Sequence, residues 1–243
     1  RYDSIVGCIK SWDFGKDRWT FPVIIDNMLN LEMLFEASIL TGDDKYKNIA
    51  INHANTTLKN HFRDDYSTWH VVDYNPEDGS VFKKLTHQGL HNESSWARGQ
   101  SWALYGYTMC YRYTKDPKYL EQAKNVAAFV KSNLPEDFVP IWDFDVKDKA
   151  IMYKDASAAA VYASAYLELY TYTKNTDYKD LAENILKSLS SDAYFSEFGE
   201  NGGFILEHSV GNFPRNGEIN VPINYADYYY LEALLRLKHI NEE

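Results

Sequence analysis

"YTMCYRYTKDPKYLEQAKNVA", residues 107–127, contains the pattern that decides the fold. An apolar, periodic run ends at Thr114, a short polar turn follows, and Tyr119 opens a second periodic run. In the turn, Asp116 can cap the second run, and Pro117 suits the first position of a helix. The apolar residues of the second run have the three-and-four spacing of an amphipathic helix: Ala123, Val126, Ala127 and Val130. The stretch therefore predicts two helices joined by a tight turn.

The same pattern occurs in "LFEASILTGDDKYKNIAINHA" (34–54) and in "LELYTYTKNTDYKDLAENIL" (167–186). The residues that close the first runs and open the second runs are Thr41 and Tyr46, Thr114 and Tyr119, and Thr173 and Tyr178. A recurring two-helix unit predicts helical hairpins in series, which form either an open solenoid or a closed α/α toroid. Because the aromatic-rich segments between the units vary in length, we favour the toroid.

Two of these segments differ from the helices in composition. "STWHVVDYNPEDGSVFKKLT" (67–86) alternates Val and aromatic residues around turn residues, which predicts a short β-hairpin. "GENGGFILEHSVGNFPRNGEI" (199–219) is rich in Gly and Asn and is interpreted as a long loop. "NYADYYYLEALLRLKHI" (224–240) is interpreted as a further inner helix. Without a linker or a low-complexity run, residues 1–243 are predicted to form a single all-α domain.

Composition excludes several classes of function. The formal net charge of −10 argues against binding to nucleic acid, whose phosphates require a basic surface. No run approaches the ~20 apolar residues that span a bilayer, so no membrane partner is inferred. The two cysteines, Cys8 and Cys110, form neither a disulfide framework nor a metal-binding pair. Ligand spacings for a metal and the glycine motifs of nucleotide sites are also missing, so we infer no metal and no cofactor.

"HNESSWARGQSW" (91–102) crowds aromatic rings and hydrogen-bonding side chains together. A guanidinium such as Arg98 pairs with a carboxylate through two parallel hydrogen bonds, and Trp96 and Trp102 could offer flat apolar faces to a sugar ring. Together they suit an acidic sugar. The alternative is a helix–helix contact in which Arg98 binds a buried carboxylate, and the sequence alone leaves both open.

Asp26 lies in "PVIIDNMLN" (22–30), where an apolar run meets a helix. It could be an ordinary helix cap that accepts backbone N–H bonds. Alternatively, its apolar neighbours could raise the pKa of its carboxyl by desolvation, which would suit a general acid. His70, in the predicted hairpin, and His87 and Gln88, just past it, could converge near one helix mouth and bind sugar hydroxyls. Further carboxyls that could join a site are Glu93, Asp143, Asp145 and Asp155.

Several stretches together resemble the unsaturated glucuronyl hydrolases, glycoside hydrolase family 88, from about Ser11 to Lys238. They are "SWDFGKDRWTFPVIIDNMLNLEML" (11–34), "THQG" (86–89), "SSWARGQSWALYGY" (94–107), "WDF" (142–144) with "DASAAA" (155–160), and "NYADYYYLEALLR" (224–236). The resemblance implies an (α/α)6 toroid with its site at one mouth. It also implies hydrolysis of the oligosaccharides that polysaccharide lyases release, by acid/base hydration of the 4,5 double bond of the terminal uronic acid, without metal or nucleotide.

Carried over by position, the resemblance makes Asp26 the acid/base aspartate. It places six residues at the sugar site: His70, Gln88, Trp96, Arg98, Trp102 and His208. The implied partner is an unsaturated oligosaccharide, such as one derived from a glycosaminoglycan.

The family has a second active-site aspartate upstream of the position of Asp26, and this sequence does not include it. We therefore expect the ring to be incomplete at its N-terminal side, with an open edge that is covered by further chain or by self-association. The alternatives are the sister activity on unsaturated rhamnogalacturonyl substrates, an oligosaccharide-binding module without activity, and a helical-repeat interaction protein. The sequence does not decide between the two compartments considered, the bacterial cytoplasm and the periplasm.

Overall fold

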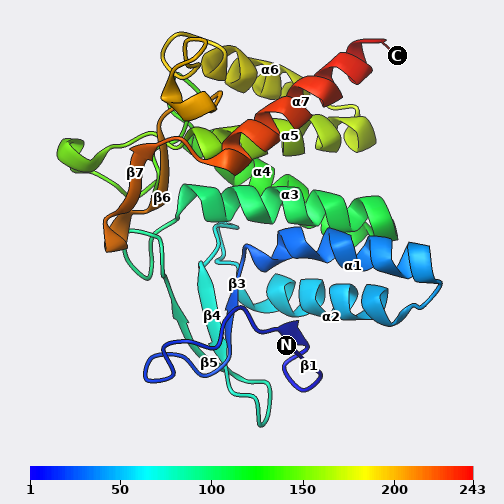
Figure 1. The fold of residues 1–243 in the computed structure, drawn as a ribbon. Coiled ribbons are helices and arrows are strands. Elements are labelled where there is room, and N and C mark those ends of the chain that lie inside the picture. Colours follow the sequence, from blue (N-terminus) through cyan, green and yellow to red (C-terminus); the bar gives the residue numbers. More distant parts are fainter. Residues whose placement is uncertain (243) are drawn as a thin grey trace.

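The computed structural model describes residues 1–242, which contain seven α-helices and several short strands (Figure 1). The helices are α1 (Asn27–Thr41), α2 (Lys45–Asn60), α3 (Ala97–Thr114), α4 (Pro117–Asn133), α5 (Ala156–Thr173), α6 (Thr176–Leu189) and α7 (Asn224–Glu242). The three predicted hairpins are α1–α2, α3–α4 and α5–α6, and α7 is the predicted further helix. None of the helices in this range is long and apolar enough to cross a bilayer.

The repeated threonine ends the first helix of every hairpin. The hydroxyl of Thr114 donates to the carbonyl four residues earlier, at 2.7 Å, and accepts the backbone N–H of Asp116 at 3.2 Å. Thr41 and Thr173 make the same two bonds in their own turns. The residue after each threonine has left-handed backbone angles: Gly42, Lys115 and Lys174. The repeat is therefore a helix-termination device that satisfies the last carbonyls and reverses the chain.

The next helix of two hairpins begins with a side-chain cap. Asp116 accepts the N–H of Lys118, and Pro117 is the first helical residue, as predicted. Asn175 caps α6 in the same way by accepting the N–H of Asp177. In the first hairpin Asp43 accepts the N–H of Lys45, whereas Asp44, the residue before α2, makes no capping bond with its side chain. Capping oxygens at these positions hold the two helices of each hairpin at a fixed turn.

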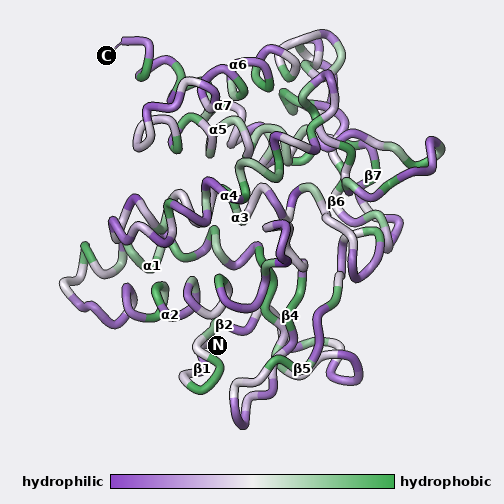
Figure 2. Tube along the Cα trace, turned by 180° about the vertical axis from the view of Figure 1, so that it is seen from behind, coloured by the Kyte–Doolittle hydropathy of each residue, from purple (hydrophilic) through white to green (hydrophobic). Residues whose placement is uncertain are grey.

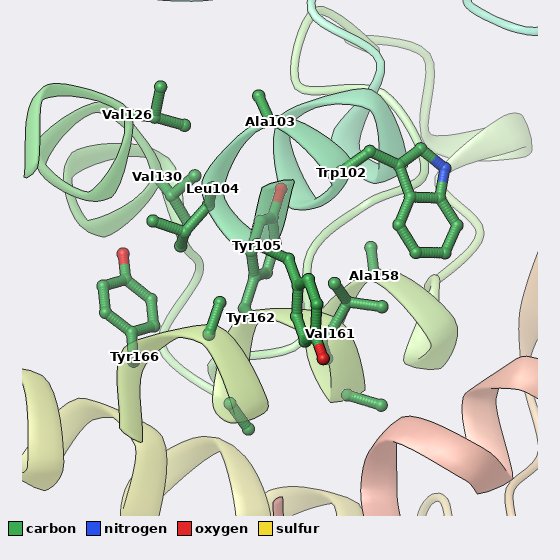
Figure 3. Close-up of a cluster of buried hydrophobic side chains, with 14 of the residues drawn as sticks. Trp102, Ala103, Leu104, Tyr105, Val126, Val130, Ala158, Val161, Tyr162 and Tyr166 are labelled. Carbon is green, nitrogen blue, oxygen red and sulfur yellow. The ribbon is translucent and has the colours of Figure 1, made fainter. Parts of the chain in front are cut away.

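The helices α1, α3, α5 and α7 lie side by side, and α2, α4 and α6 each pack against the helix before them. In the centre, α5 contributes a run of small buried residues from Ala156 to Ala160, which lets α3 and α7 approach closely. Figure 3 shows Leu104 of α3, Val130 of α4 and Tyr166 of α5 in one cluster of buried side chains. This apolar core links every helix and fixes the end of each inner helix in space.

Large exposed apolar side chains lie on the two outer members of this row. On α1 they are Met33, Ile39 and Leu40, and on α7 they include Tyr228, Leu231 and Leu235. The expectation that these edges pack against further chain or a second copy stays a prediction.

The strands form three small antiparallel sheets: β1 (Tyr2–Asp3) with β2 (Cys8–Ile9), β3 (Pro22–Ile24) with β4 (Val71–Tyr74) and β5 (Val81–Leu85), and β6 (Ser209–Asn212) with β7 (Gly217–Val221). The predicted hairpin is β4–β5, and β3 adds a third strand. Figure 2 shows the hydrophilic turn that joins β4 and β5 projecting away from the helices. Three short 3-10 helices cover Lys149–Ile151, Asn201–Gly203 and Phe213–Arg215.

The interpretation of residues 199–219 as a long loop is wrong in its second half, because β6 and most of β7 lie there. Composition hid these strands, because Gly and Asn, which strands disfavour, alternate with the few β-branched residues Val210, Ile219 and Val221. Asn216 supplies the left-handed turn between them, with φ of 52°. Their pairing is supported from outside the segment, since α3 donates hydrogen bonds to the carbonyls of Val210 and Gly211. A tertiary contact thus stabilises a hairpin that its local sequence does not favour.

Figure 1 shows β3 to β7 at one end of the helices, where α1, α3 and α7 begin, whereas β1 and β2 pack along α2. The first residues of α1, α3 and α7 and the loops beside them therefore lie close together. We call this end of the helices the mouth.

Candidate active site

Asp26 immediately precedes α1, but its carboxylate does not cap the helix. Its backbone has helical angles (φ −56°, ψ −30°), whereas a capping residue needs extended ones to fold its side chain back onto the helix. The carboxyl instead lies near His70, which precedes β4. Its Oδ2 atom is buried and has no hydrogen-bond partner among the described residues, while 26% of the side chain remains accessible. Of the two predicted roles for Asp26, the capping role is therefore contradicted.

Burial raises the pKa of Asp26 from 3.8 to about 6. The positive charge of Arg98, the backbone N–H of Asp26 and the Trp102 indole all act in the opposite direction, but loss of solvation outweighs them. The carboxyl is thus partly protonated near neutral pH. It can give a proton and take one back in the same pH range.

His70 precedes β4 and is 3% exposed. Its Nδ1 atom accepts the backbone N–H groups of both His87 and Gln88, each at 3.1 Å. Its Nε2 atom lies 3.6 Å from Oδ2 of Asp26. Burial lowers the pKa of His70 well below its usual value, with smaller contributions from His87 and Arg98. The ring is therefore neutral and presents one nitrogen to the candidate acid.

The two tryptophans of the predicted motif pack against residues of the site. Trp96 is 2% exposed, and its ring lies against His70, with 4.5 Å between ring centroids, and against the Arg98 guanidinium at 4.6 Å. Trp102 is 8% exposed and contacts Tyr225 and Tyr229 of α7 edge-on. Neither indole N–H has a hydrogen-bond partner in residues 1–242. The rings thus set the positions of His70 and of the α7 N-terminus.

Arg98 is buried and binds inside the protein. Its Nη1 donates to Asp155 at 2.9 Å and to the Val210 carbonyl at 2.5 Å, and its Nη2 donates to the Gly211 carbonyl at 2.7 Å. Asp155 is fully buried and also caps α5. Of the two predicted alternatives, the geometry matches a contact between helices with a buried carboxylate. Arg98 therefore joins α3, α5 and β6 beside Asp26.

Gln88, in the loop after β5, binds β6, the strand that Arg98 also holds. Its Nε2 donates to the Gly211 carbonyl at 2.8 Å, and its amide oxygen has no bond to the described residues. His87 lies between His70, at 6.4 Å between centroids, and Trp12, at 5.2 Å. Trp12 in turn stacks on Phe14, which is 54% exposed. An accessible aromatic surface thus begins next to His70.

His208 lies apart from this group. It precedes β6 in a left-handed conformation, bonds Asn220 at 2.7 Å through Nδ1, and contacts the Tyr194 ring edge-on. Its backbone carbonyl accepts the N–H of Ala156 at the start of α5. The structure therefore brings together five of the predicted sugar-site residues and places the sixth at the base of the β6–β7 hairpin.

The remaining candidate carboxyls hold the loops of the mouth in place. Asp143 is fully buried and accepts the N–H of Leu90 and the hydroxyl of Ser94. Asp145 accepts the N–H of Ser95. Glu93 is exposed and lies 3.9 Å from Arg63. Within residues 1–242, no group of three or more His, Cys, Asp or Glu side chains could hold a metal ion.

Sequence reasoning missed two accessible aromatic side chains of the mouth, Trp12 and Tyr225. Both lie in stretches that carried the family resemblance. Their proximity to His87 and Trp102 depends on tertiary packing, which spacing along the chain does not reveal.

Comparison with known proteins shows that this chain is similar in sequence and fold to helical-toroid glycan hydrolases. A family model described as Glycosyl hydrolase family 76 matches residues 103–220. A curated relative from Formosa agariphila named "Unsaturated glucuronyl hydrolase" is 55% identical over 99% of this chain and 60% of its own length. A crystal structure of an unsaturated glucuronyl hydrolase specific for heparin superposes with a TM-score of 0.97 at 53% identity, covering 100% of this chain and 66% of that one.

A mutant of the unsaturated glucuronyl hydrolase from Streptococcus agalactiae, solved in complex with dGlcA-GalNAc6S, gives a TM-score of 0.78 at 36% identity over 88% of this chain and 58% of that one. Sequence and fold agree over nearly the whole chain, whereas the family 76 match covers a shorter part. The resemblance to the unsaturated glucuronyl hydrolases, glycoside hydrolase family 88, is thereby confirmed, as is the helical toroid fold. The chain spans about 60% of the length of the curated relatives that it matches.

Proposed function

We propose that this chain acts on unsaturated glucuronyl oligosaccharides of the kind that polysaccharide lyases produce, and that it releases the terminal unsaturated uronic acid by hydration. The observation that carries the proposal is Asp26. It is a carboxyl with a pKa of about 6, open to the mouth through part of its side chain, in a chain 55% identical to a named unsaturated glucuronyl hydrolase.

The proposed reaction starts at the vinyl ether of the sugar ring. Protonated Asp26 gives its proton to C4, and positive charge develops at C5 and the ring oxygen. Water then adds at C5 and returns a proton to the Asp26 carboxylate. The resulting hemiketal opens, and the remaining sugar leaves. A carboxyl with a pKa near 6 suits both steps, because each protonation state is populated at neutral pH.

The other residues of the mouth are proposed to hold the substrate or to support the groups that do. The amide oxygen of Gln88 is free to accept a sugar hydroxyl, while its nitrogen is fixed by Gly211. Arg98 acts through its charge, which favours the carboxylate of Asp26, and through the strand that it holds. Trp96 and Trp102 are proposed to hold His70 and the N-terminus of α7 in position. His208 is proposed to contribute from the β6–β7 side.

We also propose that residues 1–243 form a single catalytic domain, which is supported by the large apolar core that α1 to α7 share. The proposed substrate class is glycosaminoglycan-derived disaccharides. Two similar proteins support this class, since one is specific for heparin and another is solved with dGlcA-GalNAc6S.

The test is a spectroscopic assay of the purified chain with unsaturated chondroitin, hyaluronan and heparin disaccharides. The conjugated double bond absorbs near-ultraviolet light, so hydration removes the absorbance. We expect loss of absorbance with at least one disaccharide and a fall of about 10²-fold or more in rate for Asp26→Asn. Binding without loss of absorbance would instead indicate an oligosaccharide-binding module, and turnover of only rhamnogalacturonan-derived disaccharides would indicate the sister activity.

A further inference from the structure

The environment of His70 determines which of its two nitrogens carries the proton. Two backbone N–H groups, from His87 and Gln88, point at Nδ1 from 3.1 Å. A nitrogen that accepts hydrogen bonds has its lone pair directed at the donors and bears no hydrogen. The neutral ring must therefore carry its hydrogen on Nε2.

This arrangement also keeps the ring from becoming a cation. A second proton would have to bind Nδ1, against two N–H groups that already occupy it. The charged or titratable groups that face the ring add to this effect: Arg98 from α3, His87 from the loop after β5, and His61 after α2. His70 is therefore a permanent N–H donor at Nε2 over the range in which Asp26 titrates.

The atom that faces this donor is Oδ2 of Asp26, at 3.6 Å. Both atoms are buried and neither makes a hydrogen bond of ordinary geometry to the described residues, while the Trp102 indole also lies close enough to the Asp26 carboxyl to lower its pKa. The distance is about 0.6 Å longer than the usual N–H···O hydrogen bond, so a side-chain rotation of this size would form the bond. Because Oδ2 is enclosed, the 26% accessibility of the Asp26 side chain belongs to its other atoms.

We propose that His70 is a positioning residue that holds Oδ2 of Asp26 as a hydrogen-bond acceptor, so that the transferable proton resides on Oδ1, the oxygen open to the mouth. The backbone N–H groups of His87 and Gln88 make this possible, because they bind Nδ1 and so keep the hydrogen of His70 on Nε2. The proposal rests on the function proposed for Asp26 and adds the device that orients its proton.

Two substitutions of His70 test the acceptor role of Nδ1 and the donor role of Nε2 one at a time. His70→Asn places an amide oxygen near the Nδ1 position, where it can accept the same two N–H groups, but nothing reaches Asp26. His70→Gln places an amide N–H near the Nε2 position and keeps the donor to Asp26. His239→Asn, at the exposed far end of α7, controls for loss of a histidine.

The first measurement needs no substrate. The ¹⁵N resonances of His70 should show a protonated Nε2 and an unprotonated Nδ1. A ¹³C titration should give a carboxyl pKa for Asp26 that rises by about one unit in His70→Asn, because a donor to the carboxylate is lost, and returns toward the parent value in His70→Gln. Arg98, Trp102 and Tyr225, which also face Asp26, stay unchanged in these variants.

The second measurement is the pH dependence of kcat. We expect roughly 10-fold lower kcat in His70→Asn, with its alkaline limb moved to higher pH, and substantial recovery of both in His70→Gln. An Nδ1–H tautomer, or an Asp26 pKa unaffected by His70→Asn in a folded protein, would overturn the proposal. If the parent hydrates no unsaturated disaccharide while the NMR results are as expected, the proposed function fails and the role of His70 in orienting Asp26 stands.

Discussion

Replacing Asp26 with Asn should stabilise the protein above pH 6 while it removes activity. The pKa of the carboxyl is raised in the folded state, so folding favours its neutral form. In the unfolded chain the group ionises at its ordinary pKa near 4. Between these two values the native state holds a proton that the unfolded state has lost, and the free energy of unfolding falls as pH rises. Above pH 6 the native state contains the buried carboxylate, and the destabilisation is complete.

The size of the effect follows from the same shift. Movement of the pKa from 3.8 to about 6 corresponds to at most about 3 kcal/mol, at ~1.4 kcal/mol per unit. Water screens part of this energy, because 26% of the side chain is accessible. We therefore expect Asp26→Asn to raise the free energy of unfolding by about 1–2 kcal/mol at pH 7.5 and by almost nothing at pH 4.

The assay is urea unfolding of the parent and the variant at intervals from pH 4 to pH 7.5. Asp137→Asn is a control of opposite sign. Although Asp137 is partly buried, hydrogen bonds from Lys154 and Tyr194 lower its pKa, so its loss should destabilise the protein at neutral pH. A gain from Asp26→Asn that is the same at every pH, or that appears only at low pH, would refute the assignment of a desolvated carboxyl.

Three further substitutions test other parts of the molecule. Arg98→Lys loses the fork that binds Asp155 and the β6 carbonyls, so it should lower the free energy of unfolding by about 2 kcal/mol and raise KM; unchanged thermal stability would contradict this. Trp102→Ala should mainly raise KM, measured in the absorbance assay, because the N-terminus of α7 loses its support. Thr114→Val keeps shape but removes both turn hydrogen bonds, so we expect a loss of about 1 kcal/mol in urea unfolding and unchanged kinetics.

The helical hairpins could be predicted from the sequence because the signals for them are local. Thr114, Lys115 and Asp116 interact within one turn of chain, and the spacing of Ala123 and Val126 gives the buried face of one helix. The variable segments between the hairpins favoured a toroid over a solenoid, and the family resemblance then supplied the number of hairpins in the whole ring and the candidate site at one mouth.

The chemistry of individual site residues could not be predicted in the same way, because it depends on distant partners. Arg98 meets Asp155 across 57 positions, and Gln88 meets Gly211 across 123. The two interpretations of Arg98 were equally compatible with its motif, and only the position of the α5 N-terminus distinguishes them. For the same reason, the β6–β7 hairpin was missed: besides its own strand pairing, it depends on hydrogen bonds from Arg98 of α3, which is distant in sequence.

Asp26 shows how a backbone angle can separate a structural carboxylate from a reactive one. A carboxyl beside the first turn of a helix is usually stabilised as an anion by the free N–H groups and by the helix dipole. Here residues 25 and 26 already accept the N–H groups of Met28 and Leu29, so the helical conformation starts before α1 and the Asp26 side chain makes no capping bond. Its Oδ2 then faces a neutral histidine in an enclosed space, where desolvation outweighs the nearby positive charge. Because the Asp26 carboxyl does not cap α1, the helix N–H groups do not stabilise its anion. Its pKa therefore stays high enough for proton donation near neutral pH.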